Sequence, residues 1–483
     1  MERYYLAIDI GASSGRHILG RVQDGKIVLE EVHRFDNKQV HRSGHDCWDM
    51  DNLWNGITDG LKACKALGKI PETIGIDTWA VDYVLLDKKG NLIGDAVAYR
   101  DGRTEGMDRI VSDLIPPDFL YSRTGIQKQI FNTIYQLMAL RTQDPGQLAA
   151  ADSLLMIPDY FHYRLTGVKK QEYTNATSTG LVNAQDREWD MALIGKLGFP
   201  PKLFCPLSMP GTFAGELTPE IQEAVGFNAR VILPATHDTG SAFLAVPARD
   251  ENAVYLSSGT WSLLGVENER PITTEASRLQ NFTNEGGAWY RFRYLKNIMG
   301  LWMIQSIRRE LNGTAYVEGR KSKYAAERAY SFPDLIEEAR GAADFPSVVD
   351  ANDAGFLAPE SMVDAIKTYC AKTDQPVPVT VGEIMQCVYR SLAKCYKDAI
   401  DGLSRLTDKR YTSVNIVGGG CQDMYLNQMT ADATRLPVYA GPVEGTAIGN
   451  LIVQMIAGGE FDGLQAARDA VKRSFGIKEI KPL

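Results

Sequence analysis

The sequence predicts an α/β protein with an internally duplicated architecture and a cleft between two domains. In the first half, strands joined by small-residue turns come first, and strands alternating with helices follow. The pattern restarts near residue 253, where AVYLSSGTWSLLGVE repeats the plan of the opening YYLAIDIGASSGRHILGRV. We therefore expect an N-terminal domain over residues 1–244 and a C-terminal domain over residues 245–483. The length of 483 residues suits this division, since domains average about 150 residues.

The composition is that of an ordinary globular protein, with 44% hydrophobic and 23% charged residues. A net charge of −8 without a Lys/Arg run argues against nucleic acid or a membrane surface as a partner, so we expect small-molecule partners. No apolar run reaches the roughly 18 residues of a membrane-spanning helix, and we expect neither a signal peptide nor an anchor. The seven cysteines form no CxxC pair, which favours a reducing compartment, the cytoplasm.

The first half is expected to begin with three antiparallel strands. The second and third, RHILGRV and KIVLEEVHRF, are joined by the Gln23-Asp24-Gly25 turn. Helical spacing follows, with Asp51 as the expected N-cap. TIGIDTWAVDYVLLD predicts one strand, FNTIYQLMALRT and PDYFHYRL predict helices, and VILPA predicts a strand that ends just before His237.

The second half is expected to open with a strand pair around a Ser/Gly/Thr turn. WYRFRYLKN then predicts a strand, IMGLWMIQSIRREL a helix, and the polar stretch from about 312 to 352 an insertion. A long helix is expected over GEIMQCVYRSLAKCYKDAIDGLSRL. VNIV, YLNQMTADAT, PVYA and AIGNLIVQMIAG then predict strand, helix, strand and helix.

The Gly11–Gly15 turn matches G-x-S-x-G, the pattern of a serine hydrolase nucleophile. That pattern requires a helix after the serine, whereas RHILGRV predicts a strand, which argues against a hydrolase. The turn instead suits a cradle of backbone N–H groups and hydroxyls for phosphate oxygens, with a plain glycine hairpin as the alternative. Ser257–Thr260 supplies a matching turn in the second half.

Asp9 ends an apolar strand beside the first turn. A buried carboxylate is costly without a cation, so we expect Mg²⁺ held mainly through water, or else a carboxylate that accepts loop N–H bonds. Gly418, Gly419 and Gly420 follow a strand and precede a helix, which favours a closely approaching nucleotide. Neither a P-loop nor a GxGxxG pattern occurs, which leaves an actin-like ATPase architecture.

His237-Asp238-Thr239 follows the strand VILPA. Asp238 could accept the proton of a hydroxyl that attacks phosphorus, or it could cap a helix that begins near Gly240. His237 taken alone is more typical of a structural histidine. In IDTWAVD, acids beside Trp79 suit a sugar, although a core tryptophan with a solvated Asp77 is nearly as consistent.

Taken together, the segments DIGASSGR, HDTG, SSGTW and VGGGCQ resemble the FGGY family of carbohydrate kinases, over essentially the whole chain. IDTWAVD, HDT and LKNIMGLW resemble the members that act on L-rhamnulose. The resemblance implies two duplicated actin-like (ribonuclease H-like) ATPase domains, the N-terminal one binding sugar and the C-terminal one binding nucleotide. It also implies ATP-dependent, Mg²⁺-requiring transfer of the γ-phosphoryl group to O1 of L-rhamnulose, giving L-rhamnulose 1-phosphate and ADP.

The resemblance also implies roles for single residues. Asp238 is the implied proton acceptor, and Asp9 is the implied Mg²⁺ site, through water. Substrate contacts are implied for Ala80, His237, Asp238, Thr239 and Asn297. Nucleotide contacts are implied for Ala12, Ser13, Ser14, Gly15, Arg16, Thr260, Gln305 and Gly419.

Two points of the resemblance leave alternatives open. Ala80 stands where these kinases typically have glycine in TWGVD, so another ketose such as L-fuculose or L-xylulose stays open, as does a non-kinase actin-like ATPase. Cys370 and Cys387 could approach as a disulfide pair, which a reducing cytoplasm disfavours.

Overall fold

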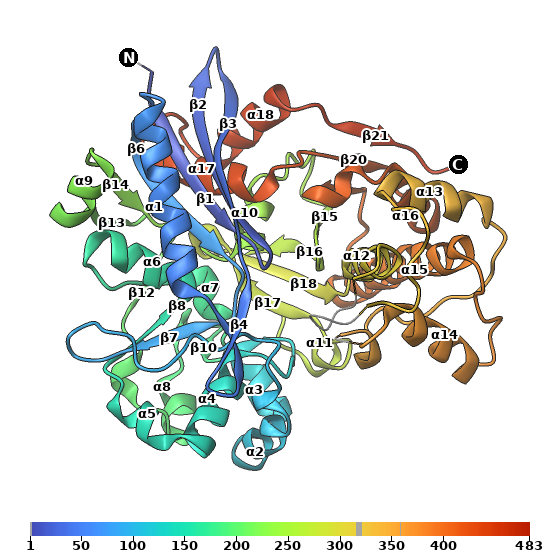
Figure 1. The fold of residues 1–483 in the computed structure, drawn as a ribbon, viewed down its shortest axis with the longest axis horizontal. Helices are drawn as coiled ribbons and strands as arrows, with labels where there is room; N and C mark the ends of the chain where they lie inside the picture. The colour runs from blue at the N-terminus through green and yellow to red at the C-terminus, as the bar shows by residue number, and fades with distance from the viewer. Residues whose placement is uncertain (1, 315–320, 358) are drawn as a thin grey trace. The chain divides into compact units, whose positions relative to one another are not determined.

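The computed structural model describes residues 2–314, 321–357 and 359–483 (Figure 1). The chain forms two compact units. Unit 1 consists of Met1–Pro247, Glu267–Leu295 and Glu444–Phe475, and unit 2 consists of Ala248–Val266, Lys296–Val443 and Gly476–Leu483. Unit 1 therefore includes two segments from the second half of the sequence.

The centre of unit 1 is a six-stranded sheet in the order β13-β14-β6-β1-β2-β3 (Figure 1). Its strands are β1 (Tyr4–Ile10), β2 (Ser14–Gln23), β3 (Lys26–Asp36), β6 (Pro71–Thr78), β13 (Phe213–Glu216) and β14 (Arg230–Ile232). β1, β2 and β3 are antiparallel, as predicted, whereas β1, β6 and β14 run parallel. The carboxyl ends of these parallel strands share one edge, which is the edge where open α/β sheets bind ligands.

Helices cover both faces of this sheet. Alternate residues of β1 point to opposite faces, and each set packs against different helices. Leu6 and Ile8 pack with apolar residues of α1 (Met50–Ala66) and α6 (Ile157–Thr166). Tyr5 and Ala7 pack with α17 (Gly445–Ala457) and α18 (Leu464–Ser474). A strand buried on both faces explains the continuous apolar run at the start of the chain.

Unit 1 also contains a second apolar core. Here β7 (Tyr83–Leu86) pairs with β8 (Ser153–Met156). The remaining helices of unit 1 are α2 (Met107–Leu114), α3 (Pro117–Thr124), α4 (Thr133–Gln143), α5 (Pro145–Ala150), α7 (Tyr173–Thr177), α8 (Met191–Lys196), α9 (Pro219–Val225), α10 (Asp238–Leu244) and α11 (Glu275–Leu279). The remaining strands are β4 (Gln39–Arg42), β5 (His45–Trp48), β9 (Gln171–Glu172), β10 (Val182–Asn183), β11 (Glu188–Trp189), β12 (Leu207–Ser208), β17 (Thr283–Gly286) and the start of β18 (Phe292–Ile298).

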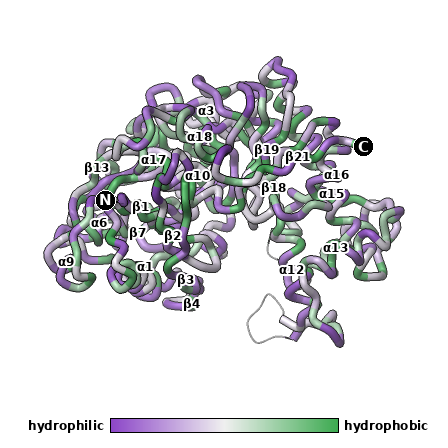
Figure 2. Tube along the Cα trace, turned by 90° about the horizontal axis from the view of Figure 1, so that it is seen from above, coloured by the Kyte–Doolittle hydropathy of each residue, from purple (hydrophilic) through white to green (hydrophobic). Residues whose placement is uncertain are grey.

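Unit 2 repeats the plan of unit 1. Its strands include β15 (Ala253–Ser258), β16 (Ser262–Asn268), β19 (Ser413–Val417), β20 (Val438–Ala440) and β21 (Lys478–Ile480). β15 and β16 form an antiparallel hairpin, and β15, β19 and β20 run parallel, as β1, β6 and β14 do in unit 1. Its helices include α12 (Trp302–Leu311), α13 (Phe332–Gly341), α14 (Met362–Lys372), α15 (Val381–Thr407) and α16 (Met424–Thr434). The predicted duplication is confirmed. Figure 2 colours each residue of the chain by its hydropathy, and the label α15 marks the long helix of unit 2.

Two expectations about single elements need correction. The N-cap of α1 is Asp49 and not Asp51, because the Asp49 carboxylate accepts the backbone N–H of Asn52 at 3.2 Å. The single strand predicted over TIGIDTWAVDYVLLD is two strands, since Val81 has a φ of 67° that a strand cannot contain. The expected insertion contains a regular helix, α13, and residues 315–320 within it lie outside the described residues.

Two further findings concern membrane-spanning helices and disulfide bonds. Within the described residues, no helix combines the length and the apolar character needed to cross a membrane. All seven cysteines, Cys370 and Cys387 included, are free thiols.

Candidate active site

Carboxylates from three segments meet at the carboxyl edge of the unit 1 sheet. Asp9 and Asp77 are the next-to-last residues of β1 and β6, and the parallel register places them side by side. Thr78 forms a β-bridge with His237, directly before Asp238. The strand topology thus assembles acids that are far apart in the sequence.

Asp9 is buried, and its charge is balanced by an arginine. Arg16 donates from Nη2 to Asp9 Oδ2 at 2.9 Å, and its Nη1 lies 2.5 Å from Glu444 Oε2. Arg16 belongs to the turn for which phosphate binding is predicted. In this structure it contacts carboxylates on both sides, so it is held beside Asp9.

Asp77 is fully buried, so a solvated Asp77 is excluded. Asn450 on α17 donates to Asp77 Oδ2 at 2.6 Å, and Gln454 donates to Asn450 Oδ1 at 2.6 Å. Burial, with the nearby charge of Asp9 as the second cause, raises the pKa of Asp77 well above its usual value. Asn450 and Gln454 were not predicted from the sequence, although two amides within the apolar segment NLIVQM were a signal.

The acids at this edge suit a magnesium ion. No group of three or more His, Cys, Asp or Glu side chains within the described residues forms a ready-made metal site. Mg²⁺ at a nucleotide, however, is commonly held by one or two carboxylates together with waters and phosphate oxygens. Asp9 and Asp77 fit this donor set, because Asp77 Oδ1 is buried without a hydrogen-bond partner.

Asp238 is the first residue of α10, whose N-cap is His237. The helix therefore begins before Gly240, and Asp238 is not its N-cap. Asp238 Oδ1 accepts the N–H of Thr239 at 2.6 Å, and 29% of the side chain is exposed. Burial raises the pKa of Asp238, and the charge of Asp9 acts in the same direction. A higher pKa makes this carboxylate a better proton acceptor.

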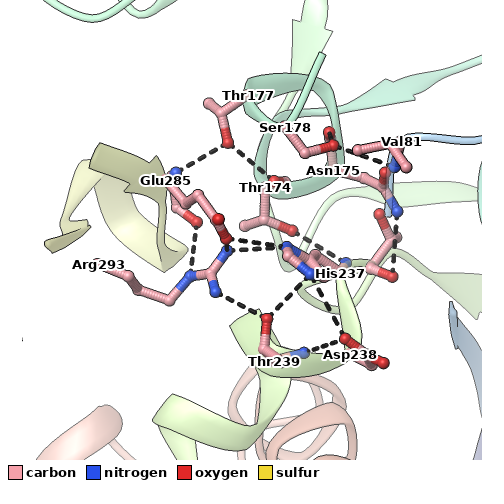
Figure 3. A network of polar contacts seen from close by, with 12 residues as sticks. Val81, Thr174, Asn175, Thr177, Ser178, His237, Asp238, Thr239, Glu285 and Arg293 are labelled. Atoms are coloured by element: carbon pink, nitrogen blue, oxygen red, sulfur yellow. Dashed lines mark hydrogen bonds and ion pairs between the residues drawn. The ribbon is translucent and has the colours of Figure 1, made fainter. Parts of the chain in front are cut away.

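The backbone before Asp238 is held by the buried Glu172. Its carboxylate accepts from the N–H of Thr236 at 3.1 Å and from the hydroxyl of Thr236 at 2.6 Å. Thr174, which donates to Glu172 Oε2 at 2.6 Å, accepts the N–H of His237 at 3.3 Å (Figure 3). These bonds attach the His237 segment to α7.

The His237 ring has polar neighbours at both nitrogens (Figure 3). Nδ1 lies 3.0 Å from Arg293 Nη2 and 3.3 Å from Glu285 Oε2. Nε2 lies 2.9 Å from Thr239 Oγ1 and 3.5 Å from Asp238 Oδ1. Glu285 and Arg293 were not predicted, although a buried-strand pattern interrupted by one arginine, FRYL, was a signal.

The segment after β6 is rigid and largely buried. Trp79 packs on Trp48 with ring centroids 4.1 Å apart, and both indoles donate to Asp82, at 2.9 and 2.7 Å. Trp79 is thus a core residue, as the alternative interpretation held. Val81 keeps its positive φ because its N–H donates to Ser178 and its carbonyl accepts from Thr133. Ala80 is half-buried in this loop, beyond the end of the strand.

The first predicted phosphate turn lies in unit 1, over Gly11–Gly15. Asn37 donates its side-chain amide to the carbonyl of Gly11 at 2.9 Å and its N–H to the carbonyl of Ser13 at 3.0 Å. These bonds engage two turn carbonyls. Asn37 was not predicted as a site residue.

Unit 2 brings the other predicted nucleotide residues together. Thr260 Oγ1 lies 3.5 Å from Gln305 Oε1, and the carbonyls of Gly259 and Thr260 accept N–H bonds from the start of α12. Gly418 and Gly420 pack against Ser258, where a Cβ would lie 2.9 and 1.9 Å from its atoms. A Cβ on Gly419 would meet no atom within 4 Å, so its backbone faces open space. Asn297, on β18, also belongs to unit 2.

The sequence and the fold have relatives among the sugar kinases. Models of the N-terminal and C-terminal domains of the FGGY family of carbohydrate kinases match residues 4–245 and 254–458. A rhamnulokinase of Halalkalibacterium halodurans is 49% identical over 98% of each chain. One of Bacillus subtilis is 43% identical over 99% of this chain and 95% of its own.

Solved structures agree on the fold. A gluconate kinase from Lactobacillus acidophilus has a TM-score of 0.78 at 16% identity, over 100% of this chain and 94% of its own. Plasmodium falciparum glycerol kinase with ADP has a TM-score of 0.74 at 14% identity, over 100% and 94%. The duplicated fold and the matches over both domains place the chain in one family: it belongs to the FGGY carbohydrate kinases.

Proposed function

We propose that the protein transfers the γ-phosphoryl group of ATP to O1 of L-rhamnulose, giving L-rhamnulose 1-phosphate and ADP. Relatives named rhamnulokinase, 40 to 49% identical over nearly the whole chain, support this substrate. The observation that carries the proposal is Asp238, a carboxylate with a raised pKa between His237 and Thr239 at the ligand-binding edge of the sheet.

Asp238 acts as the general base in this proposal. It accepts the proton of the O1 hydroxyl as that oxygen attacks phosphorus, and such assistance contributes about 10² to 10⁴ in rate. His237 and Thr239 orient the sugar by hydrogen bonds, together with Asn297 and the backbone at Ala80. The rigid loop around Val81 keeps that backbone in place.

The nucleotide is bound by two turns and a glycine loop. The proposed nucleotide contacts are those of Ala12, Ser13, Ser14, Gly15, Arg16, Thr260, Gln305 and Gly419. Mg²⁺ would be held by Asp9, through water, with Asp77 beside it. When bound, the ion neutralises charge on the phosphate oxygens. The cytoplasm, where ATP is available, is the proposed location.

The test is ADP release from ATP and Mg²⁺ over a panel of ketoses, namely L-rhamnulose, L-fuculose and L-xylulose, with a no-sugar control. We expect the highest kcat/KM with L-rhamnulose and little ADP without sugar. A higher kcat/KM with another ketose would identify that ketose as the substrate instead of L-rhamnulose. ADP release at the same rate with and without sugar would contradict the proposed sugar kinase activity.

A further inference from the structure

Arg293 is a fully buried arginine whose hydrogen bonds all stay inside unit 1. Its Nε donates to the carbonyl of Gly286 at 3.1 Å, and its Nη2 lies 3.0 Å from Glu285 Oε2. The two remaining contacts are to proposed sugar-binding residues. Nη1 donates to Thr239 Oγ1 at 2.9 Å, and Nη2 donates to His237 Nδ1 at 3.0 Å (Figure 3).

The contact with His237 determines which ring nitrogen carries the proton. A guanidinium has hydrogen-bond donors and no acceptor. When Nη2 donates across this 3.0 Å contact, His237 Nδ1 presents its lone pair, and in a neutral imidazole the proton is then on Nε2. In the competing tautomer, Nδ1–H would donate to Glu285 Oε2 over the longer distance of 3.3 Å. The N–H groups of Arg293 Nη2 and His237 Nδ1 would then face each other as two donors.

The same tautomer determines what Thr239 can do. Its hydroxyl oxygen accepts from Arg293 Nη1 and from His237 Nε2–H, both at 2.9 Å, which occupies both lone pairs. The hydroxyl hydrogen is then left for another acceptor. In the opposite tautomer Thr239 would donate to His237 Nε2 instead and could not donate to a ligand.

We propose that Arg293, paired with Glu285, is a positioning residue that holds His237 as its Nε2–H tautomer and thereby makes Thr239 a hydrogen-bond donor to the sugar. The inference rests on the proposed function, in which His237 and Thr239 contact the ketose. It adds a requirement on the substrate. The sugar must present an acceptor oxygen, a carbonyl or a hydroxyl, to Thr239.

The first test is independent of activity. Nitrogen-15 NMR of the full chain, labelled at histidine, reports the protonation of each ring nitrogen, and the His237→Gln variant assigns the His237 signals. We expect an unprotonated Nδ1 and a protonated Nε2 in the ligand-free wild type, and a mixture of tautomers in Arg293→Met. A protonated Nδ1 in the wild type would overturn the proposal.

The second test is kinetic. Arg293→Lys keeps the charge but cannot reach both acceptors, so we expect KM for the ketose to rise about tenfold while KM for ATP stays unchanged. The matched control is Arg468→Lys, a partly buried arginine of unit 1, which pairs with Glu267 at 3.0 Å and donates to the carbonyls of Phe243 and Leu244. It should leave the ketose KM and the His237 signals unchanged.

A double-mutant cycle separates positioning from a structural role. If Arg293 acts through the Thr239 hydroxyl, Arg293→Lys should raise the ketose KM less in a Thr239→Val background than in the wild type. Full additivity would overturn the proposal. Should Arg293→Lys fail to fold, Glu285→Gln, which weakens the same pair, takes its place in the cycle. Lack of L-rhamnulose turnover in the wild type would contradict the proposed function and leave the NMR result standing by itself.

Discussion

Asp82 shows what a single buried carboxylate does to this protein. It accepts N–H bonds from Trp48, Trp79 and Tyr99, yet burial still raises its pKa from 3.8 to about 6. Because the folded state holds the proton more tightly than the unfolded state, this group makes the free energy of unfolding fall as pH rises from 3.8 to about 6.

The first prediction is that Asp82→Asn removes this pH dependence. A shift of about two pKa units corresponds to about 3 kcal/mol, so wild type should lose that much stability relative to the variant between pH 3.5 and 7. Urea unfolding at several pH values measures the difference. A stability difference that is constant over this range would show that Asp82 has an ordinary pKa, and a change in the opposite direction would show that its pKa is lowered.

The second prediction concerns Gly419, whose missing side chain leaves open space. Gly419→Val should fold normally and weaken binding of an ATP analogue by about tenfold or more, because the branched side chain occupies space that a nucleotide would fill. Calorimetric titration measures this affinity. Gly102→Val is the control, since Gly102 also begins a short 3-10 helix with nothing within 4 Å. Equal affinities in both variants would place the nucleotide elsewhere.

The third prediction concerns Ala80, the position that departs from TWGVD. Ala80 does not have a positive φ, so Ala80→Gly relieves no strain. If its methyl group faces the sugar, the change should raise kcat/KM for L-fuculose or L-xylulose relative to L-rhamnulose by about 10 to 200-fold and leave the KM for ATP unchanged. Parallel changes for all three sugars, with a lower melting temperature, would make Ala80 a structural residue.

Several residues could be proposed from the sequence because chemistry and local pattern agree there. Asp9 lies near the end of the apolar strand β1 and Asp238 comes after β14, and the structure places both at one sheet edge. The residues that hold the site residues and their neighbours by hydrogen bonds were not predicted from the sequence. Asn450, Asn37, Glu285 and Arg293 make their contacts across long sequence separations, and no local pattern encodes those contacts.

At the scale of elements, α10 and α17 pack so closely that only a glycine fits between them. A Cβ on Gly449 would lie 1.7 Å from the carbonyl oxygen of Ser241, one turn along α10 from Asp238. The fourth prediction is that Gly449→Ala destabilises the protein by about 3 kcal/mol or more and lowers kcat, because α10 and its carboxylate must move.

Gly195→Ala is the matched control for this prediction. Gly195 lies in α8, and a Cβ there meets no atom within 4 Å, so alanine should stabilise by about 0.5 to 1 kcal/mol through its better helix propensity. Thermal unfolding and turnover of both variants give the comparison. If Gly449→Ala is as stable and as active as Gly195→Ala, the two helices are not in close contact.

Long, strongly patterned elements were predicted correctly, and breaks within them were not. The helical spacing over α15 extends for many turns, and the predicted helix is confirmed. The break after β6 was not predicted, because no glycine or proline stands between Asp77 and Asp87 to mark a turn. Its turn depends on Val81, whose conformation is held by Ser178 and Thr133 from distant segments. Tertiary contacts therefore override the local strand pattern.

At the scale of the whole molecule, the predicted duplication follows from a repeated strand and turn plan. The sequence did not indicate that Glu444–Phe475 belongs to unit 1, where α17 packs on the first sheet. This packing puts Asn450 beside Asp77 and Glu444 beside Arg16. The C-terminal part of the chain thus helps to position the acids of the first sheet.

We propose that Asp238 is the base for phosphoryl transfer to L-rhamnulose. The most direct measurement is rapid-quench single-turnover transfer from ATP to L-rhamnulose by wild type and by Asp238→Asn, with sugar and nucleotide affinities measured alongside. We predict a transfer rate lower by about 10² to 10⁴ in the variant, with binding retained, because the amide cannot accept the proton. A variant rate within twofold of wild type would contradict the account.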